Sequence, residues 1–487
     1  MSSFLFSSCA TRSHSPVPGP EKGGGHSLIV MRELLVLLLP VTYSWLEERI
    51  YQIGAKNYTE RREQPWFRYP HDDHDRVQTA DKETSAFGKH FIPPDDEFVA
   101  PRWTLEEQRY LPCMTKECVC LYFRGSFTHG HCFLRDGQVL AKAHRQEIRT
   151  LSDSQRRSWE LVLNQMKSSG LYNRLSRIHK YSGVHSGPAF LIWHREFLKR
   201  LELVFRRYLP DVNMGVPYWD SSLDAHLPDP RDSIIFSEQF LGETDQEGFV
   251  VTGPYANWTT MEGRPHIFRE LKTDEGGELL NSARIDWVVN SPDYNMVLGV
   301  TMPLTSCPMN HKLDARMLEF SHDYVHFFIA GDMGRSHSSS NDVIFIYHHS
   351  MIDNVFEMWR QTKQSREERE SQYPASHPDC FPPWHNFDAY MPFLQPFKNR
   401  DGLSNRYTDE MYKFAPRPSC SRENIDCGSK YLFCHQPINS EPFCMSKVKA
   451  GGNCLGFERT EICYRGKCIN GVCFKNEMTK LDKRLYM

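Results

Sequence analysis

Two histidines four residues apart, His322 and His326, constrain this chain more than any other pair of residues. Positions four apart lie on one face of an α-helix, so both imidazoles can converge on one point. Leu318 and Ile329 fall on the same face, which predicts that the imidazoles point into the core. The glutamate that follows the first histidine in the zinc-protease motif is missing, so that chemistry would lack its general base. Buried histidines that only form hydrogen bonds remain an alternative for this pair.

A later helical pattern carries His349, with Phe345 and Phe356 on its face. His348 is rotated from that face by about 100°. We therefore expect His349 to point inward as a metal ligand and His348 to be only its neighbour. Asp353, one turn further along, is expected to accept the second ring N–H of a bound histidine and so to fix its tautomer. An ordinary surface acid is the alternative for Asp353.

The first half of the chain offers a matching set of three histidines: His179, His185 and His194. His194 lies on an apolar helical pattern, and the other two precede it. Gly183 and Gly187 allow the chain to turn closely there. Each of these histidines alone is more often structural than a ligand, but two sets of three are hard to explain in that way.

The donor atoms of the two sets indicate the metal. Six neutral imidazoles with no cysteine or carboxylate favour copper over calcium, magnesium or an iron–sulfur cluster. Zinc also binds to three histidines when one position stays open, so zinc remains the rival on these residues alone.

The fifteen cysteines are unevenly distributed. Even-numbered clusters of this kind predict disulfides in an oxidising compartment, and the long, irregular gaps disfavour zinc. The pairing within the tail stays open. The clustered cysteines are Cys113, Cys118, Cys120 and Cys132, then Cys420, Cys427, Cys434, Cys444, Cys454, Cys463, Cys468 and Cys473, while Cys9, Cys307 and Cys380 stand apart.

Export is also indicated near the start of the chain. Met31 opens a short charged segment before the apolar run 34–41, which resembles a signal peptide and is too short to cross a bilayer. Met31 is therefore a candidate for the true start. Glycosylation sequons occur at Asn57 and Asn257. No later apolar stretch is long enough for an anchor, so we expect a secreted protein.

Helical patterns dominate the middle of the chain. Ser152 and Gln155 have capping-box spacing, and Gly170 supplies a stop. Further helical patterns cover about 188–207, 313–330 and 342–361, whereas 211–310 reads mostly as loop. These patterns predict a mainly α fold, a helix-bundle domain with long loops plus a small disulfide-rich C-terminal module.

Four segments are expected along the chain. They are an N-terminal extension and signal peptide (1–45), a leader and cysteine-containing segment (46–134), the histidine-bearing domain (135–416) and the cysteine-rich module (417–487). The leader shows no clear period from about 45 to 110, so we expect irregular structure there.

The two histidine segments resemble the paired copper motifs of tyrosinases, which are type 3 copper proteins. The resemblance covers about residues 135–416. Residues 145–167 and the tail 427–434 are similar to secreted tyrosinases of molluscs and related invertebrates. The landmarks that carry the resemblance are Pro217–Asp220, Gly253–Trp258, Ala330–Met333 and Asp401–Asn405.

This resemblance implies a dicopper site and an activity. One copper ion would be bound by His179, His185 and His194, and the other by His322, His326 and His349. With dioxygen as co-substrate, such a site hydroxylates monophenols or oxidises o-diphenols, and o-quinones are the products. Melanin formation or quinone tanning of extracellular matrix would follow.

The sequence departs from the family at several positions. Some relatives cross-link a cysteine to the second histidine of the first site, but Gly183 stands at that place, so no thioether can form. Asp323 replaces an asparagine that many relatives carry. We expect Asp323 and Glu319 to hold a water that deprotonates a phenol. Phe327 and Ser336 are expected to border the substrate entrance, with ordinary packing as the alternative.

Several functions remain open at this point. The net charge of -3, with acids and bases interspersed, gives no reason to expect binding to nucleic acid or to an anionic membrane. A haemocyanin-like oxygen carrier, a catechol oxidase without monophenol activity and a catalytically silent matrix protein are the alternatives to a tyrosinase. The expected partners are phenolic small molecules or tyrosyl side chains of matrix proteins, and the oligomeric state stays open.

Overall fold

Helix α4 (Asp153–Ser168) begins at the predicted capping box. The Ser152 hydroxyl accepts a hydrogen bond from the Gln155 backbone, and the Gln155 side chain accepts one from the Ser152 backbone. The helix ends before Gly170, whose φ of +77° is left-handed. On its buried face Trp159 donates from Nε1 to the Tyr347 hydroxyl at 2.7 Å. The capping box and the stop are therefore confirmed.

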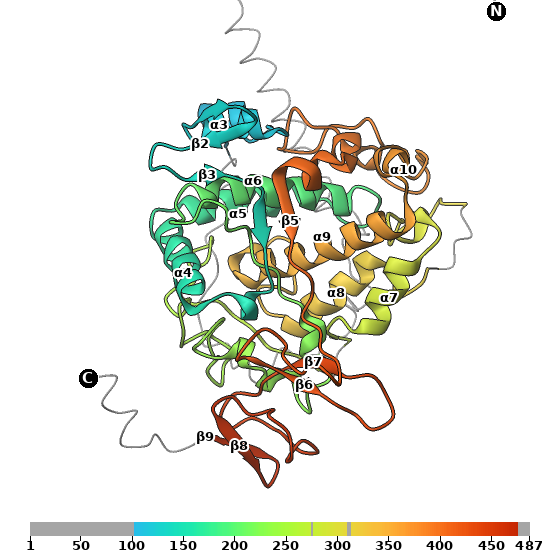
Figure 1. Ribbon diagram of the computed structural model, residues 1–487. Coiled ribbons are helices and arrows are strands. Elements are labelled where there is room, and N and C mark those ends of the chain that lie inside the picture. Colours follow the sequence, from blue (N-terminus) through green and yellow to red (C-terminus); the bar gives the residue numbers. More distant parts are fainter. Residues whose placement is uncertain (1–101, 274–275, 309–312, 476–487) are drawn as a thin grey trace, which may run out of the picture. The chain divides into compact units, whose positions relative to one another are not determined.

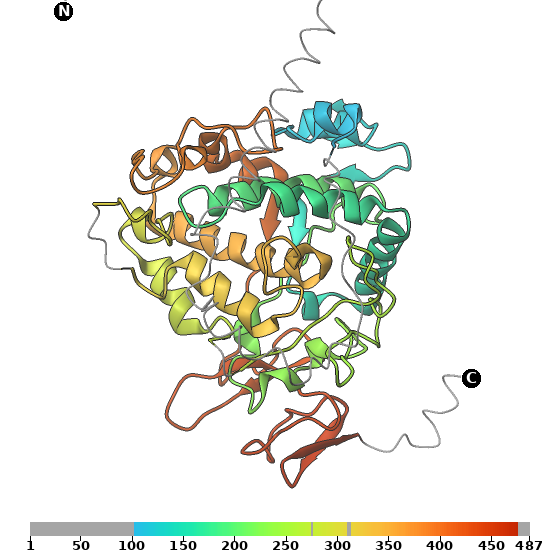
Figure 2. The same ribbon diagram turned by 180° about the vertical axis from the view of Figure 1, so that it is seen from behind.

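Figures 1 and 2 show the helices that form the core of the computed structural model, which describes residues 102–273, 276–308 and 313–475. Helix α4 packs on α5, and α9 packs on both α6 and α8. Helices α6 and α9 are buried over almost their whole length, so they form the centre of the domain. The core helices are α5 (Leu171–Ser182), α6 (Phe190–Arg206), α8 (Leu318–Ile329) and α9 (Ile344–Lys363).

Shorter helices surround this core, and two of them lie where the sequence predicted irregular structure. Helix α7 occupies part of the stretch predicted as loop, because Ile285 and Val288 pack toward α9 although only nine residues are helical. Helix α2 lies in the predicted irregular leader and begins at a capping box on Thr104. The shorter helices are α2 (Leu105–Tyr110), α3 (Lys116–Tyr122), α7 (Ser282–Asn290) and α10 (Arg366–Ser371).

Short strands join distant parts of the chain. Strand β4 (Ala143–Arg145) pairs in parallel with β5 (Tyr412–Phe414), so the two ends of the helical domain are hydrogen-bonded to each other. Strands β1 (Ser126–Thr128), β2 (His131–Phe133) and β3 (Val139–Leu140) form an antiparallel sheet. Two antiparallel hairpins follow β5, namely β6 (Leu432–His435) with β7 (Phe443–Ser446) and β8 (Gly466–Ile469) with β9 (Val472–Lys475).

Disulfides join all the cysteines in the described part of the chain, as predicted. Their sulfur atoms are therefore not available as zinc ligands. The isolated Cys307 and Cys380 also pair with each other, which the sequence did not indicate. The pairs are Cys113–Cys118, Cys120–Cys132, Cys307–Cys380, Cys420–Cys434, Cys427–Cys444, Cys454–Cys468 and Cys463–Cys473.

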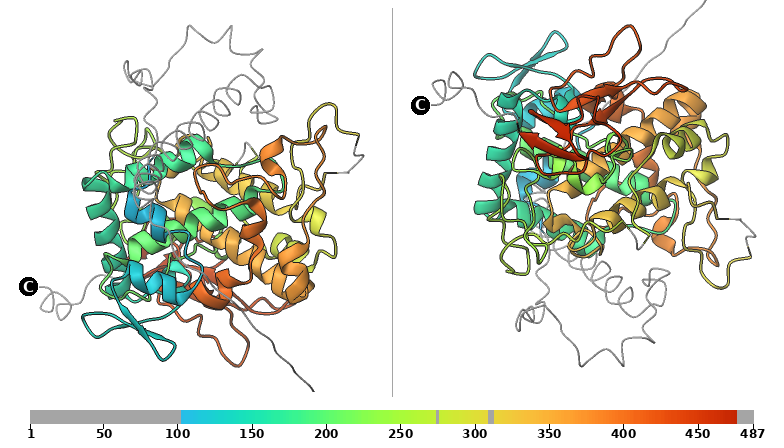
Figure 3. Two further views of the ribbon diagram at one scale, coloured as in Figure 1. Left: turned by 90° about the horizontal axis from the view of Figure 1, so that it is seen from above. Right: turned by 90° about the horizontal axis from the view of Figure 1, so that it is seen from below.

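The cysteine-rich C-terminal segment packs on the helical domain (Figure 3). Leu227 of the domain is buried together with Phe433 and Met445 of the segment. Ser233 forms an antiparallel bridge with Val448. The segment is thus tied to the 220–236 loops by apolar and backbone contacts.

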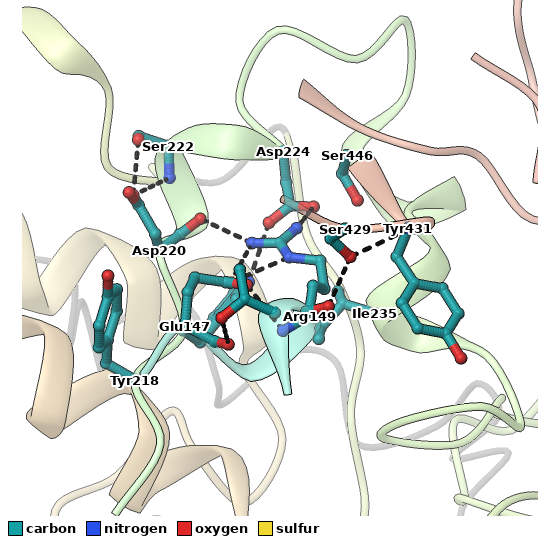
Figure 4. A network of polar contacts seen from close by, with 12 residues as sticks. Glu147, Arg149, Tyr218, Asp220, Ser222, Asp224, Ile235, Ser429, Tyr431 and Ser446 are labelled. Atoms are coloured by element: carbon teal, nitrogen blue, oxygen red, sulfur yellow. Dashed lines mark hydrogen bonds and ion pairs between the residues drawn. The ribbon is translucent and has the colours of Figure 1, made fainter. Parts of the chain in front are cut away.

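A buried arginine anchors this junction (Figure 4). The Arg149 guanidinium donates to Glu147 and to Asp224, each at 2.7 Å, and all three side chains are fully buried. The Ser429 hydroxyl donates to the Arg149 carbonyl oxygen at 2.5 Å. One arginine therefore holds two carboxylates of the helical domain and contacts the C-terminal segment.

Some predictions lie outside the described residues. These are the signal peptide after Met31, Cys9, the Asn57 sequon, and the segments 1–45 and 46–101. Within the described part, none of the helices combines the length and the apolar character that a membrane span requires.

Replacing Arg149 by leucine leaves two buried carboxylates without their cation. We expect Arg149→Leu to lower the free energy of unfolding of the metal-free protein by about 3–5 kcal/mol. The matched control is Arg231→Leu, which removes a half-exposed ion pair with Asp229 and should cost no more than about 1 kcal/mol. Urea unfolding measures both variants. Equal losses in the two would contradict the anchoring role of Arg149.

Candidate metal centre

Six histidines meet between the core helices in two adjoining sets. In each set the ligand atoms lie within 4.8 Å of one another. The sets touch, because the stacked rings of His194 and His349 have centroids 4.4 Å apart. The structure thus brings together all six predicted histidines. One set is His179, His185 and His194, and the other is His322, His326 and His349.

Helices place five of the six imidazoles. His179 lies near the end of α5 and His194 lies on α6, while α8 carries the pair with spacing four and α9 carries His349. These five side chains are buried, because they occupy the faces that pack in the bundle. His185 lies on the loop between α5 and α6 and is half-buried.

Backbone carbonyls fix the tautomers of two ligands. His194 Nδ1 lies 2.9 Å from the Phe190 carbonyl oxygen, and His326 Nδ1 lies 2.7 Å from that of Met333. A carbonyl oxygen only accepts, so each Nδ1 carries the proton and each Nε2 keeps a lone pair. Both Nε2 atoms are buried and form no hydrogen bond within the described residues. Buried lone pairs without a donor fit a bound metal ion.

Burial keeps these imidazoles neutral. It lowers the pKa of His194 to about 3 and that of His326 to about 4. Burial and neighbouring histidines hold the pKa values of His322 and His349 well below the usual range. His322 Nε2 and His349 Nε2 are 3.1 Å apart. Neutral nitrogen atoms that face each other are the donor set that the chemistry of copper or zinc requires.

His348 lies beside the cluster as a neighbour. Its Nε2 is 3.2 Å from the His322 carbonyl oxygen, and its ring stacks on that of His322 at 5.1 Å. The arrangement follows the predicted rotation of about 100° between successive helical residues.

The predicted role of Asp353 is wrong. Its carboxylate accepts hydrogen bonds from Arg145 Nη1 at 2.8 Å, Arg195 Nε at 2.6 Å and the Tyr412 hydroxyl at 2.6 Å. Two guanidinium groups are much stronger partners for a buried carboxylate than a neutral imidazole is. Asp353 therefore joins α9 to α6, β4 and β5. The carboxylate that contacts a site histidine is Asp323, whose Oδ1 is 3.0 Å from His322 Nδ1.

Glu319 contacts the loop that carries His185. Its Oε1 accepts from the Ser186 backbone N–H at 2.5 Å, and its Oε2 accepts from the Thr301 hydroxyl at 2.7 Å. Burial raises the pKa of Glu319 to about 8. The expected water between Glu319 and Asp323 stays a prediction, with both Glu319 oxygens already bonded to protein donors.

The two residues expected at the substrate entrance lie at different places. Phe327 follows the last α8 ligand and is half-buried, as is the Asp323 side chain with 19% exposure. Ser336 lies in the turn after α8, where its carbonyl oxygen accepts from the Ser339 hydroxyl. Within the described residues Ser336 forms no hydrogen bond to a site histidine, so its proposed place at the entrance stays a prediction.

Two further residues shape the site. A Cβ atom at Gly183 would lie 2.8 Å from the His179 ring, so the residue that excludes a thioether also allows close packing on a ligand. His385 accepts a hydrogen bond at Nδ1 from the Ala189 backbone N–H at 3.2 Å. His385 was missed because it follows two prolines in a loop-rich stretch, where spacing carries no signal.

Both histidine sets lie in a part of the chain that is similar to a known domain. The model named common central domain of tyrosinase matches residues 139–362. A tyrosinase-like protein, tyr-3, of Caenorhabditis elegans is 40% identical over 366 residues, covering 74% of this chain and 51% of that protein. Tyrosinase-like protein 1 of Margaritifera margaritifera is 31% identical over 300 residues, covering 60% of this chain and 57% of that protein. The chain thus spans a little over half the length of these two relatives.

A solved structure is also similar. The polyphenol oxidase of Thermothelomyces thermophila is 18% identical, with a TM-score of 0.42, covering 58% of this chain and 90% of that one.

Adjacent histidines on α9 provide a matched test of ligation. We expect His349→Gln to reduce bound copper from about two ions per chain to about one, because the set of His322 and His326 loses its third ligand. His348→Gln keeps a donor for the His322 carbonyl oxygen and should retain about two. Metal analysis of the purified, copper-loaded variants measures this. Equal copper loss in the two variants would contradict the assignment of His349.

Proposed function

Because residues 139–362 match the common central domain of tyrosinase, we propose that the protein is a copper-dependent phenol oxidase with dioxygen as co-substrate. The observation that carries the proposal is the pair of adjoining histidine sets, in which the buried Nε2 atoms of His194 and His326 form no hydrogen bond within the described residues. His179, His185 and His194 would hold one copper ion, and His322, His326 and His349 would hold the other. When bound, the two coppers supply the redox chemistry that converts phenols and catechols to o-quinones with dioxygen.

The exposure of the side chains indicates where a phenol would approach. His185, Asp323 and Phe327 are half-buried, whereas the other five ligands are buried. A substrate ring at this edge would contact the Phe327 side chain and lie close to both sets. The buried sides exclude water from the reacting centre, which prevents side reactions of the quinone.

Asp323 is the group that we assign to the proton of a monophenol. Its Oδ1 lies against His322, and its Oδ2 forms no hydrogen bond to any of the described residues. Burial and the nearby Glu319 carboxylate raise the pKa of Asp323 well above its usual range, which makes it a stronger base. Oδ2 would take the phenol proton directly or through a water shared with Glu319.

We also propose that the protein is secreted and acts on phenolic small molecules or on tyrosyl side chains of matrix proteins. The disulfides of the described residues are typical of oxidising compartments. Asn257 of the second sequon is exposed and accessible to glycosylation. Melanin formation or matrix tanning would be the outcome of the quinones released.

Copper content and quinone formation together test the oxidase. The copper-loaded protein should contain about two coppers per chain and form quinone from both a monophenol and a catechol under oxygen. Quinone from the catechol alone would restrict the protein to catechol oxidation. Reversible oxygen uptake without quinone would replace the oxidase by an oxygen carrier, and absence of copper would leave the catalytically silent matrix protein.

A substitution that removes the base tests the role of Asp323. Asp323→Asn should lower monophenol turnover at least about tenfold relative to catechol turnover, because we assign the Asp323 carboxylate to the phenolic proton that a monophenol must lose before it is hydroxylated. Asp286→Asn, which changes an exposed carboxyl on α7, is the matched control and should leave the ratio unchanged. The measurement is the ratio of kcat values for a monophenol and the corresponding catechol. An unchanged ratio in both Asp323→Asn and Glu319→Gln would remove this role.

A further inference from the structure

His185 is held in a different way from the other five histidines. It lies on the loop 183–189, between the end of α5 and the start of α6. A helix fixes the direction of each Cβ through its own backbone hydrogen bonds, but a loop keeps its shape only through its contacts. The position of the His185 imidazole therefore depends on what holds this loop.

Helix α8 holds the first half of the loop. Glu319 accepts the hydrogen bond of the Ser186 backbone N–H. Ser186 has a φ of +72°, a left-handed conformation that disfavours a side chain. Such a conformation persists only where surrounding contacts enforce it. Ser186 directly follows His185, so the Glu319 contact restrains the backbone next to this histidine.

His385 holds the second half of the loop. It accepts the hydrogen bond of the Ala189 backbone N–H and is only 1% exposed. A Cβ atom at Gly187 would lie 3.0 Å from two atoms of the His385 ring, so the ring packs directly on the loop backbone. His385 is itself fixed, since its carbonyl oxygen accepts from the Tyr373 hydroxyl at 2.8 Å.

We propose that His385 is a positioning residue of the metal centre, which keeps the His185 imidazole where it can bind copper. The inference rests on the proposed function only in taking His185 as a copper ligand. Glu319 accepts a hydrogen bond from Ser186 and His385 accepts one from Ala189, so the two side chains contact different halves of the loop. His185 directly precedes the contacted residues. Loss of His385 would remove the acceptor of the Ala189 N–H, while the Glu319 contact with Ser186 would remain.

The Cys307–Cys380 disulfide connects the segments that carry these two contacts. Thr301, which donates to Glu319, lies six residues before Cys307, and Cys380 lies five residues before His385. The Leu304 backbone N–H also donates to the Cys380 carbonyl oxygen at 3.0 Å. The segments that carry Thr301 and His385 are therefore covalently joined through the Cys307–Cys380 disulfide.

Two substitutions of similar size separate the hydrogen bond of His385 from its bulk. Asn can place Oδ1 near the position of His385 Nδ1 and accept from Ala189, whereas Leu has no acceptor. His377→Leu is the control, because His377 lies in the same segment and, among the described residues, forms no hydrogen bond with the loop: its carbonyl oxygen accepts from the Cys380 backbone N–H instead. All variants are made in the full chain.

Hydrogen exchange of the metal-free protein measures the protection of the loop amides independently of copper. In His385→Leu the peptide spanning 183–190 should exchange about tenfold faster at Ala189, because a buried donor loses its acceptor. His385→Asn and His377→Leu should keep the protection of the parent protein. Unchanged protection in His385→Leu would overturn the proposal.

The affinity for copper measures whether the loop change affects His185 as a ligand. His385→Leu should bind one of its coppers about 10–100-fold more weakly, and His385→Asn should restore the parent affinity. Loss of loop protection with unchanged affinity for both coppers would overturn the positioning role. A parent protein that binds copper but forms no quinone would refute the proposed oxidase and leave this inference standing. A parent that binds none would refute both the oxidase and the role toward copper, while exchange still decides whether His385 holds the loop.

Discussion

The carboxylate of Asp353 joins the two central helices, each of which carries one histidine of the candidate metal centre. It accepts hydrogen bonds from Arg195 of α6, which directly follows His194, and it lies one turn after His349 on α9. The same carboxylate holds Arg145 of β4 and Tyr412 of β5, the two strands that join the ends of the helical domain. One buried charge cluster therefore sets the distance between the helices that carry a ligand from each set. Without Asp353, the described residues would leave Glu202 as the carboxylate partner of Arg145 and Glu357 as that of Arg195.

Next to this cluster lie buried imidazoles, and burial disfavours their protonated, charged form. The imidazoles of His194 and His326 remain uncharged because desolvation lowers their pKa values, and backbone carbonyl oxygens accept hydrogen bonds from their Nδ1–H groups. The buried Nε2 atoms of His194 and His326 have no hydrogen-bond donor among the described residues. Folded proteins tolerate such unsatisfied polar atoms mainly at functional sites. Asp323, at the half-exposed edge, is the carboxylate beside a ligand. The candidate centre thus has a buried side and an edge at which His185 and Asp323 are only half-buried.

Local signals predicted much of this correctly. The capping box at Ser152, the spacing of His322 and His326, and the rotation of His348 away from His349 depend on residues within a few turns of one helix. Such signals fail where the deciding partner is distant in sequence. Asp353 has the spacing of a ligand-orienting acid, but Arg145 lies 208 residues away and forms the stronger contact. The pairing of Cys307 with Cys380 and the role of His385 are distant in the same sense.

By itself, the sequence determined the helical character of the domain, the disulfide-rich tail and the six histidines as one donor set, because periodicity and residue chemistry are local properties. The tertiary structure decided which carboxylate contacts a histidine, how the His185 loop is held and how the C-terminal segment is anchored through Arg149. These outcomes depend on competition between buried partners from different elements. That competition is settled only when the helices pack, because only then do the competing groups come within hydrogen-bonding distance.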